Sequence, residues 1–323
     1  MRNGYNLFLL FLIWVFTINQ LRAKDIDSLE LVISNLDTPL KRADKLNELG
    51  IANFKTDMGV ASAYLNRAFK ISEEVNYSSG SAKALLYLGI ISFKKNNLAD
   101  CIELTTNSAY KFNLASDTMN EALANLQMGI YFYKHSMFEK SAASYLKAQA
   151  LYEKISDNAK LGSCLNNIGL IYYQLKQYSK AKKSWEQGLS LVEDSGNKKS
   201  IISLMMNLGL ASLKQGDLKN ANEFQTRALK LSEETNDINN QAKIKNNLGA
   251  IFRAQNDFDK AKYHFQQSLI TAGKIIVREQ STKERFSVDH WSQMTINLQN
   301  YHDLAEIYLE EKNYTQAIKM AKK

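Results

Sequence analysis

The stretch that decides the fold is residues 161–194, LGSCLNNIGLIYYQLKQYSKAKKSWEQGLSLVED. In its first half, apolar and small residues recur at i, i+3, i+4 and i+7: Leu165, Ile168, Gly169 and Tyr172. This spacing places them on one face of a helix. The pattern breaks at residues 176–177 and then resumes as a second amphipathic helix. The stretch therefore predicts two antiparallel helices joined by a short turn.

The same unit recurs along the chain with a period of 40 residues from Gly89 to Gly249. With one earlier and one degenerate later copy, the marker position holds Gly50, Gly89, Gly129, Gly169, Gly209, Gly249 and Ala305. From the second copy onward, a large apolar residue follows nine positions later and a small residue twelve positions later. Turn-forming residues stand near the boundaries: Asp117, Asp157, Asn197 and Asp237. These recurring positions predict about six full helix pairs and an incomplete seventh.

Glycine inside a helix needs a reason, because each one costs about 1 kcal/mol relative to alanine. Close approach of the two helices in a pair would compensate for that cost. We expect Gly169 to face the small residue Ala181, and we expect Gly129 and Gly209 to be wedged between neighbouring helices in the same way.

The composition agrees with long helices and short turns. The chain has 323 residues, 45% of them hydrophobic, and its single proline is Pro39. Two cysteines exclude a disulfide scaffold, and Cys101 and Cys164 are expected to be unpaired thiols because a whole repeat separates them. Four scattered histidines leave little scope for metal or acid–base chemistry. The net charge of +8 is spread without a long basic block, so nucleic-acid binding is not expected.

The repeat resembles the tetratricopeptide repeat family over residues 38–323. The family pattern of an apolar-Gly pair, an aromatic three residues later and a small residue in the second helix is present, with Phe132, Tyr172 and Phe252 as the aromatics. The unit is 40 residues long and lacks the family's usual proline, as in the elongated repeats of kinesin light chains and bacterial sensory proteins. The resemblance implies an all-α solenoid, a right-handed superhelix of antiparallel helix pairs, that binds partners in a concave groove.

The two ends of the chain differ from the repeats. Residues 7–18 are an apolar run of signal-peptide length, so residues 1–23 are expected to be a cleaved signal peptide. An uncleaved anchor and a buried N-terminal helix are the alternatives. Residues 24–37 are expected to form a leading cap helix, and Pro39 to open the first repeat. About residues 277–292, extra sequence separates the last two repeats and predicts longer helices, a surface loop or a partner-specific insertion.

Asparagines recur two and three residues before the marker glycine, at positions that face the concave groove in the tetratricopeptide repeat family. They are Asn166, Asn167, Asn207, Asn246 and Asn247. An amide offers a donor and an acceptor together, which suits holding the backbone of an extended peptide whatever its side chains. The alternative is that these asparagines join neighbouring helices.

Cations and tyrosines complete the predicted groove. The cations stand near the ends of first helices: Lys94, Lys134, Lys214 and Arg253, with Lys55 in the first copy. They could bind an acidic partner, or they could simply complement the helix dipole. The tyrosines are Tyr87, Tyr133 and Tyr173. They could anchor apolar side chains of a ligand or pack between repeats.

These observations predict an exported scaffold that binds a protein or peptide partner, with an acidic or extended partner favoured. Catalytic residues, a cofactor, a metal, a nucleic-acid partner and a membrane span in the mature chain are not expected. The asparagine and lysine pattern with which related repeats grip the acidic tails of heat-shock chaperones is absent, because no asparagine follows the marker glycine. The alternative is a sensory module of a bacterial histidine kinase or DNA-binding regulator that lacks its output domain.

Overall fold

The computed structural model describes residues 31–282 and 288–323, apart from the side chains of residues 274–282 and 288–293. All regular structure in these ranges is helical, and no strand occurs in them. The prediction of an all-α solenoid is confirmed. Within the described ranges, no helix has both the length and the apolar character needed to span a membrane. The predicted signal peptide, residues 1–23, lies outside these ranges.

The chain divides into two compact units, Met1–Leu151 and Tyr152–Lys323, here called unit 1 and unit 2. The division falls inside α7 (Phe138–Lys154). Unit 1 contains α2 (Pro39–Asn53), α3 (Met58–Glu74), α4 (Ser78–Lys94), α5 (Leu98–Leu114), α6 (Thr118–Lys134) and the larger part of α7 (Phe138–Lys154).

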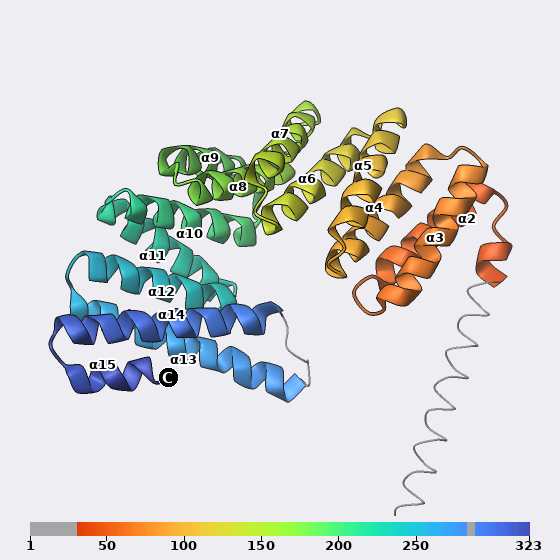
Figure 1. Ribbon diagram of the computed structural model, residues 1–323. Coiled ribbons are helices and arrows are strands. Elements are labelled where there is room, and N and C mark those ends of the chain that lie inside the picture. Colours follow the sequence, from red (N-terminus) through yellow and green to blue (C-terminus); the bar gives the residue numbers. More distant parts are fainter. Residues whose placement is uncertain (1–30, 283–287) are drawn as a thin grey trace, which may run out of the picture. The chain divides into compact units, whose positions relative to one another are not determined.

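Unit 2 continues the same alternation of helices (Figure 1). It contains α8 (Asn158–Gln174), α9 (Tyr178–Val192), the 3₁₀ turn η1 (Glu193–Ser195), α10 (Lys198–Lys214), α11 (Leu218–Glu234), α12 (Ile238–Ala254), α13 (Phe258–Thr282), α14 (Val288–Glu310) and α15 (Tyr314–Ala321). The extra sequence at 277–292 extends α13 and α14, and residues 283–287 lie outside the description.

Each unit is built in two layers of helices. The first helix of a pair packs against the second helix of the same pair, and also against the first helix of the next pair. In unit 2 these neighbouring first helices are α8, α10, α12 and α14. They form one continuous layer. The exposed surface of this layer consists of side chains from first helices only.

The turns between helices use a repeated pattern of capping. In the turn before α6, Ser116 has a left-handed backbone (φ 56°), and the N–H of Asp117 donates to the carbonyl of Phe112 (2.9 Å). The Asp117 side chain then accepts from the backbone N–H of Asn120 (3.1 Å) and caps the next helix. The predicted turn-formers at residues 157, 197 and 237 cap α8, α10 and α12 in the same way. Tight turns of this kind keep successive helices antiparallel.

The marker glycines are wedged between helices, as predicted. A Cβ on Gly169 would overlap the indole of Trp185, lying 2.5 Å from Cε2, so the glycine makes room for this large ring, a neighbour that the sequence analysis did not name. Gly129 makes room for the ring of Tyr145 in the same way, with a Cβ 2.5 Å from Cδ1. The side chain that needs the space stands sixteen residues after the glycine.

The N-terminal end of the described chain is helical over residues 31–34, within the predicted cap helix. Ile33 is 4% exposed and packs with Leu46, Tyr64 and Ala68 of the first helix pair. Pro39 opens α2 behind the capping residue Thr38, as predicted.

Candidate peptide-binding surface

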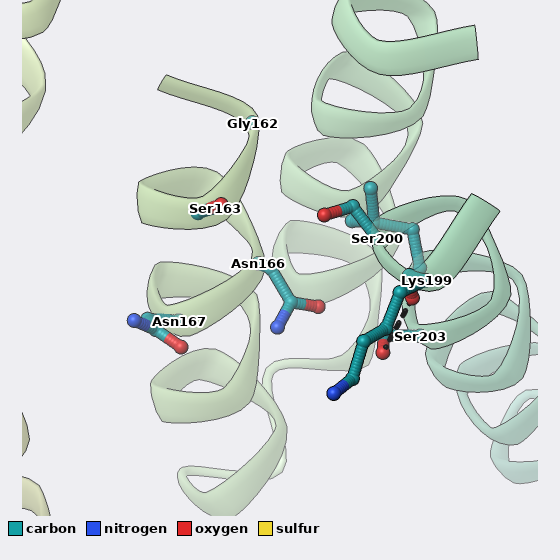
Figure 2. A pocket seen from close by; sticks show the side chains of 8 residues that line it. Gly162, Ser163, Asn166, Asn167, Lys199, Ser200 and Ser203 are labelled. Carbon is teal, nitrogen blue, oxygen red and sulfur yellow. Dashed lines mark hydrogen bonds between the residues drawn. The ribbon is translucent and has the colours of Figure 1, made fainter. Parts of the chain in front are cut away.

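Two adjoining hollows lie on the layer of first helices in unit 2. The smaller, about 270 Å³, lies between α8 and α10 and is lined by Gly162, Ser163, Asn166, Asn167, Lys199, Ser200, Ser203 and Leu204 (Figure 2). The larger, about 570 Å³, is lined by Asn166, Leu170, Ser203, Met206, Asn207, Leu210, Asn240, Lys243, Asn246, Asn247, Thr295 and Ile296. We call the residues of both hollows the amide surface. Among the residues that the structure describes, amides, hydroxyls and two lysines supply its polar groups, and no carboxylate lines it.

Some of the asparagines predicted to face the groove join neighbouring helices. The Nδ2 of Asn207 on α10 donates to Oδ1 of Asn166 on α8 at 2.8 Å. The backbone carbonyl of Asn166 also accepts from Nε1 of Trp185 at 2.9 Å, so α8, α9 and α10 meet at this residue. Asn166 therefore positions helices and lines both hollows at once.

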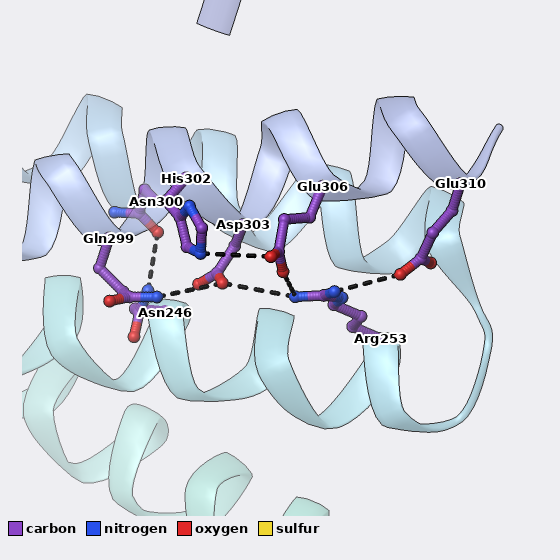
Figure 3. Close-up of polar contacts among 8 residues, drawn as sticks. All are labelled: Asn246, Arg253, Gln299, Asn300, His302, Asp303, Glu306 and Glu310. Atoms are coloured by element: carbon purple, nitrogen blue, oxygen red, sulfur yellow. Dashed lines mark hydrogen bonds and ion pairs between the residues drawn. The ribbon is translucent and has the colours of Figure 1, made fainter. Parts of the chain in front are cut away.

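A second amide chain fixes α14. The Nδ2 of Asn246 on α12 donates to Oδ1 of the fully buried Asn300 at 2.9 Å (Figure 3). Asn300 donates in turn to Oγ of Ser268 on α13 at 2.9 Å, and Ser268 donates to the carbonyl of Ala242 at 2.8 Å. This chain of hydrogen bonds holds the last helix pair against the preceding one. The sequence analysis missed Asn300, although a buried asparagine five residues before Ala305 is a departure from the apolar repeat pattern.

Asn167 and Asn247 stand apart from the other asparagines. Each lies two residues before a marker glycine, is half-buried and lines a hollow. Within residues 31–282 and 288–323, neither side chain has a hydrogen-bond partner. Their donors and acceptors are therefore available to a ligand. Of the five predicted groove asparagines, these are the two that form no side-chain hydrogen bond in the part of the chain that the structure describes.

The predicted cations do not gather at the amide surface. Lys94, Lys134 and Lys214 are the exposed last residues of α4, α6 and α10, the position that the helix dipole favours. Lys94 also lies 4.4 Å from the centre of the Phe54 ring. Lys55 is exposed just after α2. None of these lysines lines either hollow.

Arg253 serves in ion pairs between α12 and α14. Its guanidinium lies 2.6 Å from Glu306, 3.1 Å from Glu310 and 3.5 Å from Asp303 (Figure 3). Burial raises the pKa of Asp303, and the nearby charge of Arg253 partly opposes that shift. The arginine therefore joins α12 to α14, a role that neither interpretation of the predicted cations included.

The predicted tyrosines are half-buried: Tyr87 packs between the first two repeats, and Tyr133 and Tyr173 pack within their own repeats. Tyr87 meets Phe54 edge-on with ring centres 6.2 Å apart. Tyr133 meets Phe138 at 5.9 Å, and Tyr173 meets Tyr178 at 5.3 Å. Burial raises the pKa of Tyr173. None of the three lines a hollow.

The described chain offers little reactive chemistry. Neither Cys101 nor Cys164 forms a disulfide and both are buried, as predicted. Burial raises the pKa of the Cys164 thiol to about 12, which keeps it protonated and a poor nucleophile at neutral pH. The amide surface can form hydrogen bonds and attract negative charge, and these are properties of a binding site.

Comparisons with known proteins agree with the repeat pattern. Two models described as tetratricopeptide repeat match residues 162–195 and 200–269. Comparison with curated proteins gives no match. Among solved structures, the chain is similar to BtubC (BKLC) from P. vanneervenii, with 16% identity and a TM-score of 0.60 over 66% of this chain and 90% of that one.

Two further solved structures resemble the chain over a larger part of its length. Aspartyl phosphate phosphatase F from Bacillus subtilis has 16% identity and a TM-score of 0.60, covering 80% of this chain and 73% of that one. A Rap protein complexed with competence and sporulation factor has 15% identity and a TM-score of 0.55, covering 88% and 94%. At such identities the likeness concerns the fold. The two matching models and the repeat spacing show that this chain contains tetratricopeptide repeats.

Proposed function

We propose that the amide surface of unit 2 binds an extended segment of a partner protein without catalysis. The observation that carries the proposal is the pair Asn167 and Asn247, whose half-buried side chains line the hollows without a partner among the described residues. A polar group withdrawn from water is stabilised by gaining hydrogen bonds. The backbone of an extended peptide offers N–H and C=O groups that match both ends of an amide.

The shape of the surface supports the same ligand. The two hollows share Asn166 and Ser203, so they run continuously from α8 across α10 to α12 and α14. Apolar side chains between the amides, such as Leu170 and Leu210, offer contacts for alternate side chains of a peptide. One solved structure of similar fold, the Rap protein, is a complex with competence and sporulation factor.

The variant Asn167→Ala/Asn247→Ala tests this proposal. A random dodecapeptide library displayed on phage is selected on the full chain, and the affinity of the selected peptides is measured by fluorescence anisotropy. We expect the double variant to bind them roughly ten- to thirtyfold more weakly, because each lost hydrogen bond contributes on the order of 1 kcal/mol.

The matched control is Asn107→Ala/Asn158→Ala, which removes two exposed asparagines outside the hollows. It should bind the peptides like the parent chain. Equal affinity of the two double variants, or a library that yields no binding peptide, would contradict the proposal. Circular dichroism confirms that both variants keep their helical content.

We further propose that the protein is exported, because residues 7–18 form an apolar run of signal-peptide length. Expression of the full chain in a Gram-negative host should give a periplasmic protein whose first residue is Lys24, read by N-terminal sequencing. An intact chain that retains Met1, in either the cytoplasmic or the membrane fraction, would contradict cleavage and export.

A further inference from the structure

Two lysines at the amide surface have no carboxylate partner. Lys243 on α12 is half-buried and lines the larger hollow beside Asn240 and Asn247. Lys199 on α10 lines the smaller hollow, and Figure 2 shows its side chain extending over the space beside Asn166. In the described part of the chain, neither ammonium group has an ion-pair partner. Neither lysine was among the cations predicted from the sequence.

Two acidic residues nearby in the sequence have other partners. Glu234 forms an ion pair at 3.2 Å with Lys198, the residue before Lys199. Asp237 accepts from both the backbone and the side chain of Asn240, at 3.1 and 2.8 Å, and caps α12. Among the described residues, the hollows are lined by two positive charges and no negative ones. Lys199 is exposed, but Lys243 is partly desolvated, and a partly desolvated cation without a counter-charge is unfavourable, so a bound carboxylate would relieve it.

We infer that the segment bound at the amide surface carries carboxylates, which Lys243 and Lys199 receive while Asn167 and Asn247 hold the backbone. This inference rests on the proposed function and names the chemical class of its ligand, an acidic extended peptide. Neutral amides and hydroxyls supply the rest of the described polar lining, and these groups do not repel negative charge on the ligand. The surface thus selects acidic segments by its own lysines and not by those at the ends of α4, α6 and α10.

The test compares Lys199→Gln/Lys243→Gln with the control Lys198→Gln/Lys214→Gln. Both variants lose two positive charges from unit 2, but the control lysines do not line the hollows. Each chain is used to select from the random dodecapeptide library, and the selected peptides are sequenced. The parent and the control should enrich peptides in Asp and Glu, and they should bind the best one with similar affinity.

The hollow variant should lose the acidic enrichment and bind that peptide roughly five- to thirtyfold more weakly at low salt, with the difference shrinking as salt screens the charges. Amidation of the peptide's C-terminus separates the two sources of carboxylate: unchanged affinity assigns the contact to side chains, and loss assigns it to the terminus. Selected peptides without acidic enrichment, or equal weakening in both variants, would overturn this inference while leaving peptide binding intact. Failure to select any peptide would instead remove the proposed function.

Discussion

Replacing Gly169 with alanine is expected to lower the free energy of unfolding of unit 2 by about 2–3 kcal/mol. The added methyl group would overlap the indole of Trp185, which is 1% exposed and cannot swing aside. Its Nε1 also donates to the carbonyl of Asn166, so displacement of the ring breaks a hydrogen bond between α9 and α8. These costs exceed the gain of about 1 kcal/mol that alanine brings to a helix. Chemical denaturation of the full chain, followed by tryptophan fluorescence, measures the change.

Gly273→Ala is the matched control for this substitution. Gly273 also lies inside a helix, but in the described part of the chain no atom from outside its own helical backbone lies within 4 Å of the position that its Cβ would take. Here only the helix preference acts, so stability should rise by about 0.5–1 kcal/mol. Opposite signs for the two glycines would support the steric role of the marker position. If Gly169→Ala were neutral or stabilising, the packing of Trp185 against the glycine would be wrong.

Replacing Asn300 with alanine is expected to destabilise the docking of α14 and α15 by about 2–3 kcal/mol. The fully buried side chain accepts from Asn246 and donates to Ser268, so truncation removes two hydrogen bonds and leaves a cavity. Hydrogen exchange read by mass spectrometry should show faster exchange in α14 and α15, with little change in α8 and α9.

The neighbouring substitution Gln299→Ala serves as control. Gln299 is exposed and donates to Asp303 at 3.1 Å across one turn of the same helix. Its loss should cost less than about 0.5 kcal/mol, because exposed polar contacts contribute little. Equal exchange rates in the two variants would show that the buried amide chain does not hold the last helix pair.

The fold could be predicted from the sequence because the marker residues of the repeat recur at a regular spacing. The glycine at residues 89, 129, 169, 209 and 249 recurs at a constant spacing, and its placement between helices follows from the cost of glycine in a helix. The partner of Gly169 could not be read in the same way. The residue sixteen positions later varies between copies (Thr105, Tyr145, Trp185, Gln225 and Phe265), so no single residue type marks that column.

The candidate surface was only partly predictable. The positions that face outward from the first helices follow from the helical period, and these include Asn167 and Asn247. Whether an outward asparagine is used by the fold depends on the residue opposite it on the next helix, as Asn207 is for Asn166. Lys243 was missed because its significance lies in the absence of nearby carboxylates, which only a three-dimensional arrangement reveals.

Selective ¹⁵N labelling of asparagine in the full chain gives the most direct test of the central claim. A library-selected peptide is titrated in, and the side-chain NH₂ resonances, assigned through single substitutions, are followed by NMR. If unit 2 holds a ligand backbone at its amide surface, the signals of Asn167 and Asn247 should shift and saturate with the peptide. Shifts confined to asparagines outside the hollows, such as Asn107 and Asn158, would place the ligand elsewhere and contradict the account.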